Sequence, residues 1–129
     1  MRYLGIDFGL RNIGLSFAEG PLAEPLTQKQ YQFEHQLLKF LQRLVQEKQI
    51  NTIIIGLPEG KLTPQVKDFG QKLKSLTNLP IHYQDEAFST QEAKAKLLQA
   101  QAPQKKRQQD HVAAATQILQ SYLDDRPKA

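Results

Sequence analysis

Four carboxylates stand where the sequence predicts that strands end or a helix begins. Asp7 closes the first predicted strand, Asp85 and Glu86 follow a later one, and Asp110 opens the last predicted helix. Side chains at the ends of different elements can reach a common rim of a sheet. Carboxylates that converge there could hold hard divalent cations through their oxygens. Two such ions about 4 Å apart can activate a water and stabilise the leaving oxygen in phosphodiester hydrolysis.

Each carboxylate also has a simpler structural explanation. An Asp at a strand end, such as Asp7, often serves a turn. Asp110 precedes an amphipathic run, where Asp is a preferred helix N-cap, and Asp85 and Glu86 could favour the positive end of a following helix. Position by position the structural roles are favoured, so the case for catalysis depends on the whole set.

The hydrophobic pattern predicts the elements that must position these residues. Strands are expected over 3–9, 13–18, weakly within 26–33, over 52–56 and over 80–84, and helices over 34–48, 64–77, about 89–98 and 110–123, with a loop over 99–109. A helix between two buried strands implies a βαβ crossover. The order therefore predicts a single α/β domain over residues 1–129 with a mixed sheet.

Composition narrows the class of protein. The chain has 129 residues, 40% of them hydrophobic and 23% charged, which suits one globular domain and excludes a disordered or fibrous protein. The absence of cysteine excludes disulfides, thiolate zinc sites and a cysteine nucleophile. Only a few apolar residues precede the charged Asp7, so the N-terminal apolar run is too short for a signal peptide or membrane anchor. We therefore expect a cytoplasmic protein with no membrane partner.

The positive charge is concentrated in the middle of the sequence. Residues 61–107 carry nine Lys/Arg and four Asp/Glu, whereas residues 1–60 carry six of each. Such a block could approach a polyanion, although a solvated lysine-rich helix face is at least as common.

The histidines are weaker signals. His111 follows Asp110 directly and could influence proton transfer near it. An exposed histidine at a helix start is nevertheless the favoured interpretation.

Four sequence blocks, taken in order, resemble those of the YqgF (RuvX) family. Residues 5–16 resemble its opening Asp-x-Gly followed by Arg-x-Ile-Gly, and 55–58 its Val/Ile-Gly-Leu-Pro after a buried strand. Residues 85–90 resemble its Asp-Glu-Arg-x-Thr/Ser-Thr box, and 110–119 its closing Asp-x-x-Ala-Ala helix. The resemblance covers nearly the whole chain. It implies a ribonuclease H-like fold, in which a five-stranded mixed sheet carries helices on both sides.

The resemblance also implies a function. Members are described as Holliday-junction resolvases, or as nucleases that process the 5′ end of precursor 16S ribosomal RNA. By motif position, Asp7, Glu86 and Asp110 are the expected catalytic, metal-binding carboxylates, and Asp85 is an auxiliary metal ligand. Magnesium is the expected ion, with manganese as a substitute.

Basic residues near these motifs are candidates for phosphate contacts. They are Arg11, Lys61, Lys105, Lys106 and Arg107. The run from 105 to 107 is equally well explained as a solvated loop.

One departure from the family pattern bears on catalysis. Ala87 stands where the family box usually has arginine, which removes guanidinium donors suited to a phosphate. Three interpretations therefore stay open. The preferred one, on the family description alone, is a nuclease acting on precursor ribosomal RNA; the second is a resolvase of branched DNA, which requires a twofold homodimer. The third is a non-catalytic module that binds RNA or ribosome-assembly particles.

Overall fold

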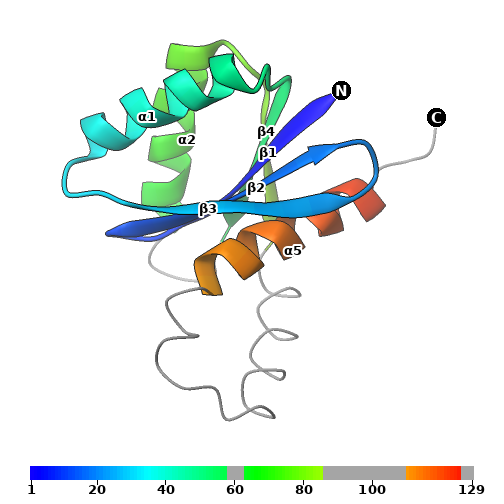
Figure 1. The fold of residues 1–129 in the computed structure, drawn as a ribbon. Coiled ribbons are helices and arrows are strands. Elements are labelled where there is room, and N and C mark those ends of the chain that lie inside the picture. The colour runs from blue at the N-terminus through cyan, green and yellow to red at the C-terminus, as the bar shows by residue number, and fades with distance from the viewer. Residues whose placement is uncertain (58–62, 86–109, 126–129) are drawn as a thin grey trace, which may run out of the picture.

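The computed structural model describes residues 1–57, 63–85 and 110–125 and arranges them as a sheet with helices on both sides (Figure 1). In chain order the elements are β1 (Arg2–Phe8), β2 (Asn12–Glu19), β3 (Ala23–Gln30), α1 (Glu34–Glu47), β4 (Thr52–Leu57), α2 (Thr63–Thr77), β5 (Ile81–Asp85) and α5 (Asp110–Asp125). The helix predicted over about 89–98 and the loop predicted over 99–109 lie outside the described residues. Among the described helices, none combines the length and the apolar character that crossing a membrane requires.

The sheet has five strands in the order β3-β2-β1-β4-β5. β1 pairs antiparallel with β2 and parallel with β4, and β4 pairs parallel with β5. The turn residues predicted the hairpin of β1 and β2, and the run Ile53–Ile55 predicted the buried strand β4. The two lie side by side, because β4 pairs with β1. The α/β class with a five-stranded mixed sheet is confirmed.

The position of β3 corrects one prediction. The strand runs from Ala23 to Gln30 and includes Pro25, whereas the sequence favoured a weaker strand within 26–33. Proline cannot donate a ladder hydrogen bond, so it is tolerated only at a sheet edge or a bulge. β3 is an edge strand, and its pairing with β2 shifts register between Leu15 and Ser16, where Pro25 pairs with Ser16.

Alternate residues of the central strand face different helices. Leu4, Ile6 and Phe8 belong to the core that α1 and α2 build on one side of the sheet. Tyr3 belongs to the smaller core beneath α5 on the other side. Because side chains alternate along a strand, Asp7 shares the α5 side with Tyr3.

Helix α5 packs unusually close to β1 and β2 because glycines lie beneath it. A methyl group at Gly14 would overlap the backbone carbonyl of His111, and one at Gly5 would overlap Ser16 and crowd Leu119. The fully buried Ser16 donates its hydroxyl to the carbonyl of Ala115 at 2.7 Å. These contacts fix where the first turn of α5 lies along the sheet.

Candidate active site

Asp7 lies near the carboxyl end of the central strand, under the start of α5. Its backbone pairs with Gly14 of β2, the glycine over which α5 begins. The Asp7 side chain is 12% exposed. Burying an aspartate to this degree requires a hydrogen-bonding or charged partner.

His111 is that partner. Its Nδ1 lies 2.7 Å from Oδ2 of Asp7. A carboxylate can only accept hydrogen bonds, so with Asp7 ionised the bond requires a proton on Nδ1. The ring also lies against the backbone of Gly9, because a methyl group there would come within 3.1 Å of its Cε1. The favoured interpretation of His111 as an exposed helix-start residue is therefore wrong: its side chain is 35% exposed and held on Asp7.

The same packing brings the start of α5 to Asp7. The helix begins at Asp110, one residue before His111, so the backbone of Asp110 lies near the end of β1, where Asp7 is the last residue but one. The Asp110 side chain lies outside the described residues. The residue that follows Asp110 thus contacts Asp7, although the two aspartates are about a hundred positions apart in sequence.

Asp85 ends β5 on the other face of the sheet. Tyr83, two residues earlier, packs against the core of α1 and α2, and Asp85 shares its side because side chains alternate. Gln84 instead faces α5, where its amide donates to Asp125 at 3.0 Å. The pairing ladder also leaves β4 between β5 and the strand of Asp7. The structure therefore does not bring Asp85 and Asp7 together.

Arg11 lies in the turn that follows Asp7, and Tyr31 holds this turn at two points. The Tyr31 N–H donates to the Arg11 carbonyl at 2.9 Å, and its hydroxyl donates to the Gly9 carbonyl at 2.6 Å. Burial, and then the nearby Glu34 carboxylate, raises the pKa of the Tyr31 phenol above its usual value. The hydroxyl consequently keeps its proton and remains a donor at neutral pH.

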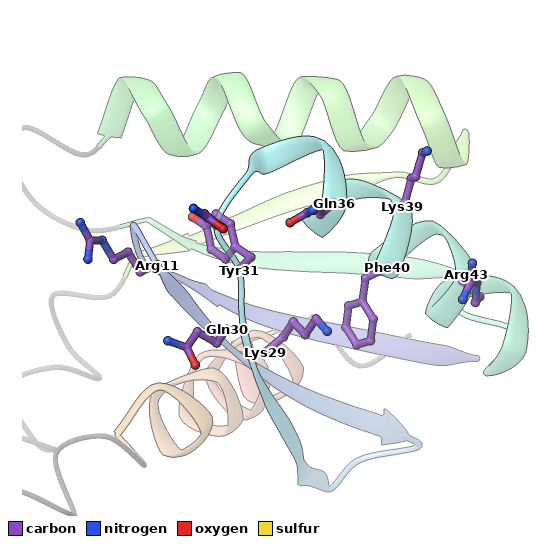
Figure 2. Close-up of a pocket in the computed structure, with 9 residues that line it drawn as sticks. Arg11, Lys29, Gln30, Tyr31, Gln36, Lys39, Phe40 and Arg43 are labelled. Atoms are coloured by element: carbon purple, nitrogen blue, oxygen red, sulfur yellow. The ribbon is translucent and has the colours of Figure 1, made fainter.

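Beside this turn the surface is hollowed between the end of β3 and α1 (Figure 2). The hollow has a volume of about 930 Å³ and is lined by Arg11, Lys29, Gln30, Tyr31, Gln32, Gln36, Lys39, Phe40 and Arg43. Sequence reasoning singled out Arg11 but missed the three other cations. For Lys39 and Arg43 a signal was present in the spacing of residues 36, 39, 40 and 43, which share one face of a helix; Lys29 lies in β3 and had no such signal.

The remaining predicted site residues lie outside the described residues. They are Glu86, Ala87, Lys61, Lys105, Lys106 and Arg107. Within the described parts of the chain, no three His, Asp or Glu side chains gather as a metal-binding group; Asp7 and His111 meet as a pair.

The residues present at this rim fit a hard divalent cation. Asp7 offers carboxylate oxygens, the ligands that Mg²⁺ prefers, and the helix that starts with Asp110 begins beside it. Among the described residues, no lysine or arginine forms an ion pair with Asp7. Carboxylates that bind metals are themselves held by hydrogen bonds, and His111 supplies one to Asp7.

Comparison with known proteins gives concordant matches. The family model described as "RuvX: Holliday junction resolvase" matches residues 1–125. A protein of Protochlamydia amoebophila named "Putative pre-16S rRNA nuclease" is 37% identical, over 97% of this chain and 94% of its own. A protein of the same name from Syntrophomonas wolfei is 34% identical, over 96% of this chain and 94% of its own.

Solved structures share the fold at low sequence identity. Thermus thermophilus RuvC in complex with a Holliday junction substrate aligns over 94% of this chain and 91% of its own, with a TM-score of 0.65 and 12% identity. The fowlpox virus resolvase in complex with Holliday junction DNA aligns over 99% of this chain and 100% of its own, with a TM-score of 0.64 and 9% identity.

Proposed function

Because the chain belongs to the RuvX family of Holliday junction resolvases, we propose that it is a divalent-metal-dependent nuclease whose active site lies at Asp7 and the start of α5. The chain is a phosphodiester-hydrolysing enzyme, as its family and its nuclease-named relatives indicate. The observation that carries the location is the contact between His111 and Asp7, which joins the end of the central strand to the first turn of α5.

Asp7, Glu86 and Asp110 are the residues that we assign to metal binding and catalysis. Mg²⁺ or Mn²⁺ held by such carboxylates activates a water and stabilises the leaving oxygen of a phosphodiester. We choose Glu86 rather than Asp85 because Asp85 lies on the sheet face opposite Asp7. The side chains of Glu86 and Asp110 lie outside the described residues, so the assignment rests on their motif positions and on where β5 ends and α5 begins.

The described residues around Asp7 hold it in place. His111 fixes the orientation of the carboxylate through Oδ2. Gly14 allows α5 to approach, and Ser16 anchors the helix through the Ala115 carbonyl. Such preorganisation matters because a small displacement of a catalytic group can cost about a hundredfold in rate.

The proposed substrate is precursor 16S ribosomal RNA, cleaved near its 5′ end in the cytoplasm on or beside assembling ribosomal particles. The names of the two relatives, each aligned over more than nine tenths of both chains, support this substrate. Four-way DNA junctions are the second candidate. The description of the family model favours them, and they require the protein to act as a homodimer with two active sites.

The test is a cleavage assay on two end-labelled substrates, a 5′ fragment of precursor 16S RNA and a four-way DNA junction. Each is incubated with wild type after chelation of divalent metals, and then after adding back Mg²⁺ or Mn²⁺. We expect no cleavage in chelator and restored cleavage with either ion, because the carboxylates need a cation to activate water. Cleavage of the RNA but not of the junction supports the preferred substrate.

Other outcomes would change the proposal. Junction cleavage by a protein that sediments as a dimer would move the assignment to the second candidate. Cleavage that persists in chelator would contradict metal dependence. Nucleic-acid binding without any cleavage by folded wild type would identify a binding module, and Ala87→Arg would then test whether the arginine usual in the family restores activity.

A pair of neighbouring variants tests the choice of Glu86 over Asp85. Glu86→Gln should reduce the metal-dependent rate by at least about a hundredfold, since a metal ligand contributes several kcal/mol to the transition state. Asp85→Asn should change it by less than about threefold, because screened interactions of exposed charges are weak. Single-turnover rates at saturating Mg²⁺ measure both. The reverse order of effects would transfer the ligand role to Asp85.

A further inference from the structure

The hollow beside the active-site turn is a basic groove. Its walls carry the cationic side chains Arg11, Lys29, Lys39 and Arg43, and no Asp or Glu is among the described residues that line it. Figure 2 shows Arg11 at one end, Arg43 at the other, and Lys29 with Phe40 between them. These four hold most of the positive charge of residues 1–60, a segment in which acidic and basic residues balance overall.

Helix α1 supplies one wall of the basic groove as a single stripe. Gln36, Lys39, Phe40 and Arg43 follow the spacing i, i+3, i+4 and i+7, which places them on one helix face. The stripe spans about 10 Å of helix length, at a rise of roughly 1.5 Å per residue. The neighbouring face of α1 is buried against the sheet, so the stripe is fixed relative to β3.

The charges in the basic groove are not neutralised within the protein. Of the ion pairs formed by the described residues, none involves Arg11, Lys29, Lys39 or Arg43. Glu34, in the first turn of α1, is engaged by Lys72 at 2.7 Å. The groove therefore presents a net positive field to solvent, which attracts a polyanion.

The basic groove and the proposed active site share one turn. The Gly9 carbonyl accepts the hydroxyl of Tyr31 from the groove side, and the His111 ring lies against Gly9 from the side of Asp7. Arg11 follows in the same turn and forms the near end of the groove. The turn over residues 9–11 therefore lies between Asp7 and the basic groove, so a strand of nucleic acid that leaves Asp7 past Arg11 would reach the groove over this turn.

We propose that the basic groove binds the sugar–phosphate backbone of one nucleic-acid strand that extends from the cleavage site past Arg11 toward Arg43. This inference rests on the proposed nuclease function and adds the path of the strand beyond the active site. Gln30, Gln32 and Gln36 supply neutral hydrogen-bonding groups between the cations, as phosphate and sugar contacts require.

The dimensions and lining favour a single strand recognised without regard to its sequence. A volume of about 930 Å³ is at the upper end for small-ligand pockets, which suits a short stretch of one strand. The Lys29 ammonium covers the Phe40 ring at 4.8 Å from its centroid. This face of the ring is therefore occupied by Lys29 and does not stack on a base. Binding through phosphates alone depends strongly on salt and weakly on sequence.

The experiment measures binding in the presence of a chelator, so that cleavage does not interfere. The probes are a fluorescent, unstructured RNA of about 12 nucleotides, a size within the range of single-strand sites, the DNA of the same sequence, and a blunt RNA duplex of that length. The proteins are wild type, Lys39→Gln, the double variant Lys39→Gln/Arg43→Gln, and Lys74→Gln. Lys74 is the matched control because it is an exposed lysine on the neighbouring helix α2, outside the groove.

We expect the dissociation constant of the double variant for both single strands to rise at least about tenfold at low salt. The slope of log affinity against log salt should fall by roughly 0.7 for each lost phosphate contact, thus by about 1.4 for the double variant and half of that for Lys39→Gln. Lys74→Gln should match wild type in slope and affinity. Melting temperatures check that all variants are folded, which is expected because the altered side chains are exposed.

The contrary results are distinguishable. Unchanged slopes in the double variant, with normal binding by wild type, would overturn the groove and leave the nuclease proposal intact. An equal loss of affinity in Lys74→Gln would show that binding depends only on the net charge of the protein, and it would also overturn the proposed role of the groove. A loss for the duplex as large as that for the single strands would overturn the single-strand path. Absence of binding by wild type to all three probes would overturn this inference, while the proposed function is decided separately by the metal-dependent cleavage assay.

Discussion

Replacing Asp7 by asparagine should abolish metal-dependent cleavage while the protein stays folded. The substitution removes the charge that a divalent cation requires but keeps the shape of the side chain. A bound cation contributes several kcal/mol to transition-state stabilisation, so the rate should fall by at least about a thousandfold. The asparagine oxygen can still accept from His111, so the free energy of unfolding should drop by only about 1 kcal/mol.

Single-turnover cleavage of the preferred substrate and thermal unfolding, measured side by side, check this expectation. Asp68→Asn is the control, because Asp68 is an exposed carboxylate on α2 whose partner is Lys72. That variant removes the same charge from an exposed position on another helix and should cleave within about twofold of wild type, as surface ion pairs contribute little. Asp7→Asn with near-normal activity would refute the carboxylate mechanism, and a loss of folding in it would show that Asp7 is chiefly structural.

The local parts of the fold could be predicted from the sequence because they depend on neighbouring residues. The spacing of Leu37, Leu38, Leu41 and Val45 predicted α1, and these residues form its buried face. The unbroken run at Ile53–Ile55 predicted a strand buried on both sides, which β4 is. Pro25 misled the placement of β3, since a proline at a sheet edge and a proline in a loop give the same local signal.

The contacts that build the site could not be predicted in the same way, because they join distant parts of the chain. His111 and Asp7 are 104 positions apart, and the periodicity of α5 does not reveal which of its residues meets the end of β1. The basic groove could not be predicted from the sequence for a related reason. Summing charges along residues 1–60 gives zero, whereas folding gathers Lys29, Lys39 and Arg43 with Arg11 on one side.

The close approach of α5 to the sheet makes Gly14 the position where the smallest addition should have the largest structural effect. A methyl group in the variant Gly14→Ala would overlap the backbone carbonyl of His111 and crowd the amide of Val112. Backbone atoms cannot rotate away as a side chain can, so the first turn of α5 must shift. Overpacking of this kind costs about 3 kcal/mol, which corresponds to a fall of about 10 °C in melting temperature for a chain of this size.

The same shift should reduce cleavage by more than the loss of stability explains. It moves His111 and the start of α5 away from Asp7, and a displacement of roughly 1 Å at a catalytic group can cost about a hundredfold in rate. Gly20→Ala is the matched control. It adds the same methyl group where no atom lies within 4 Å, at a φ of 115°, so its cost is confined to the backbone conformation, about 1 kcal/mol.

Both variants should be assayed well below their melting temperatures, where each is fully folded. Gly20→Ala should then cleave within about twofold of wild type, whereas Gly14→Ala should retain about a hundredth of the rate. Equal rates in the two variants would mean that the seating of α5 on β2 serves stability alone. A selective loss in Gly14→Ala, with no loss in Gly20→Ala, would tie catalysis to the position of that first turn, because only at Gly14 does the added methyl group meet the backbone of α5.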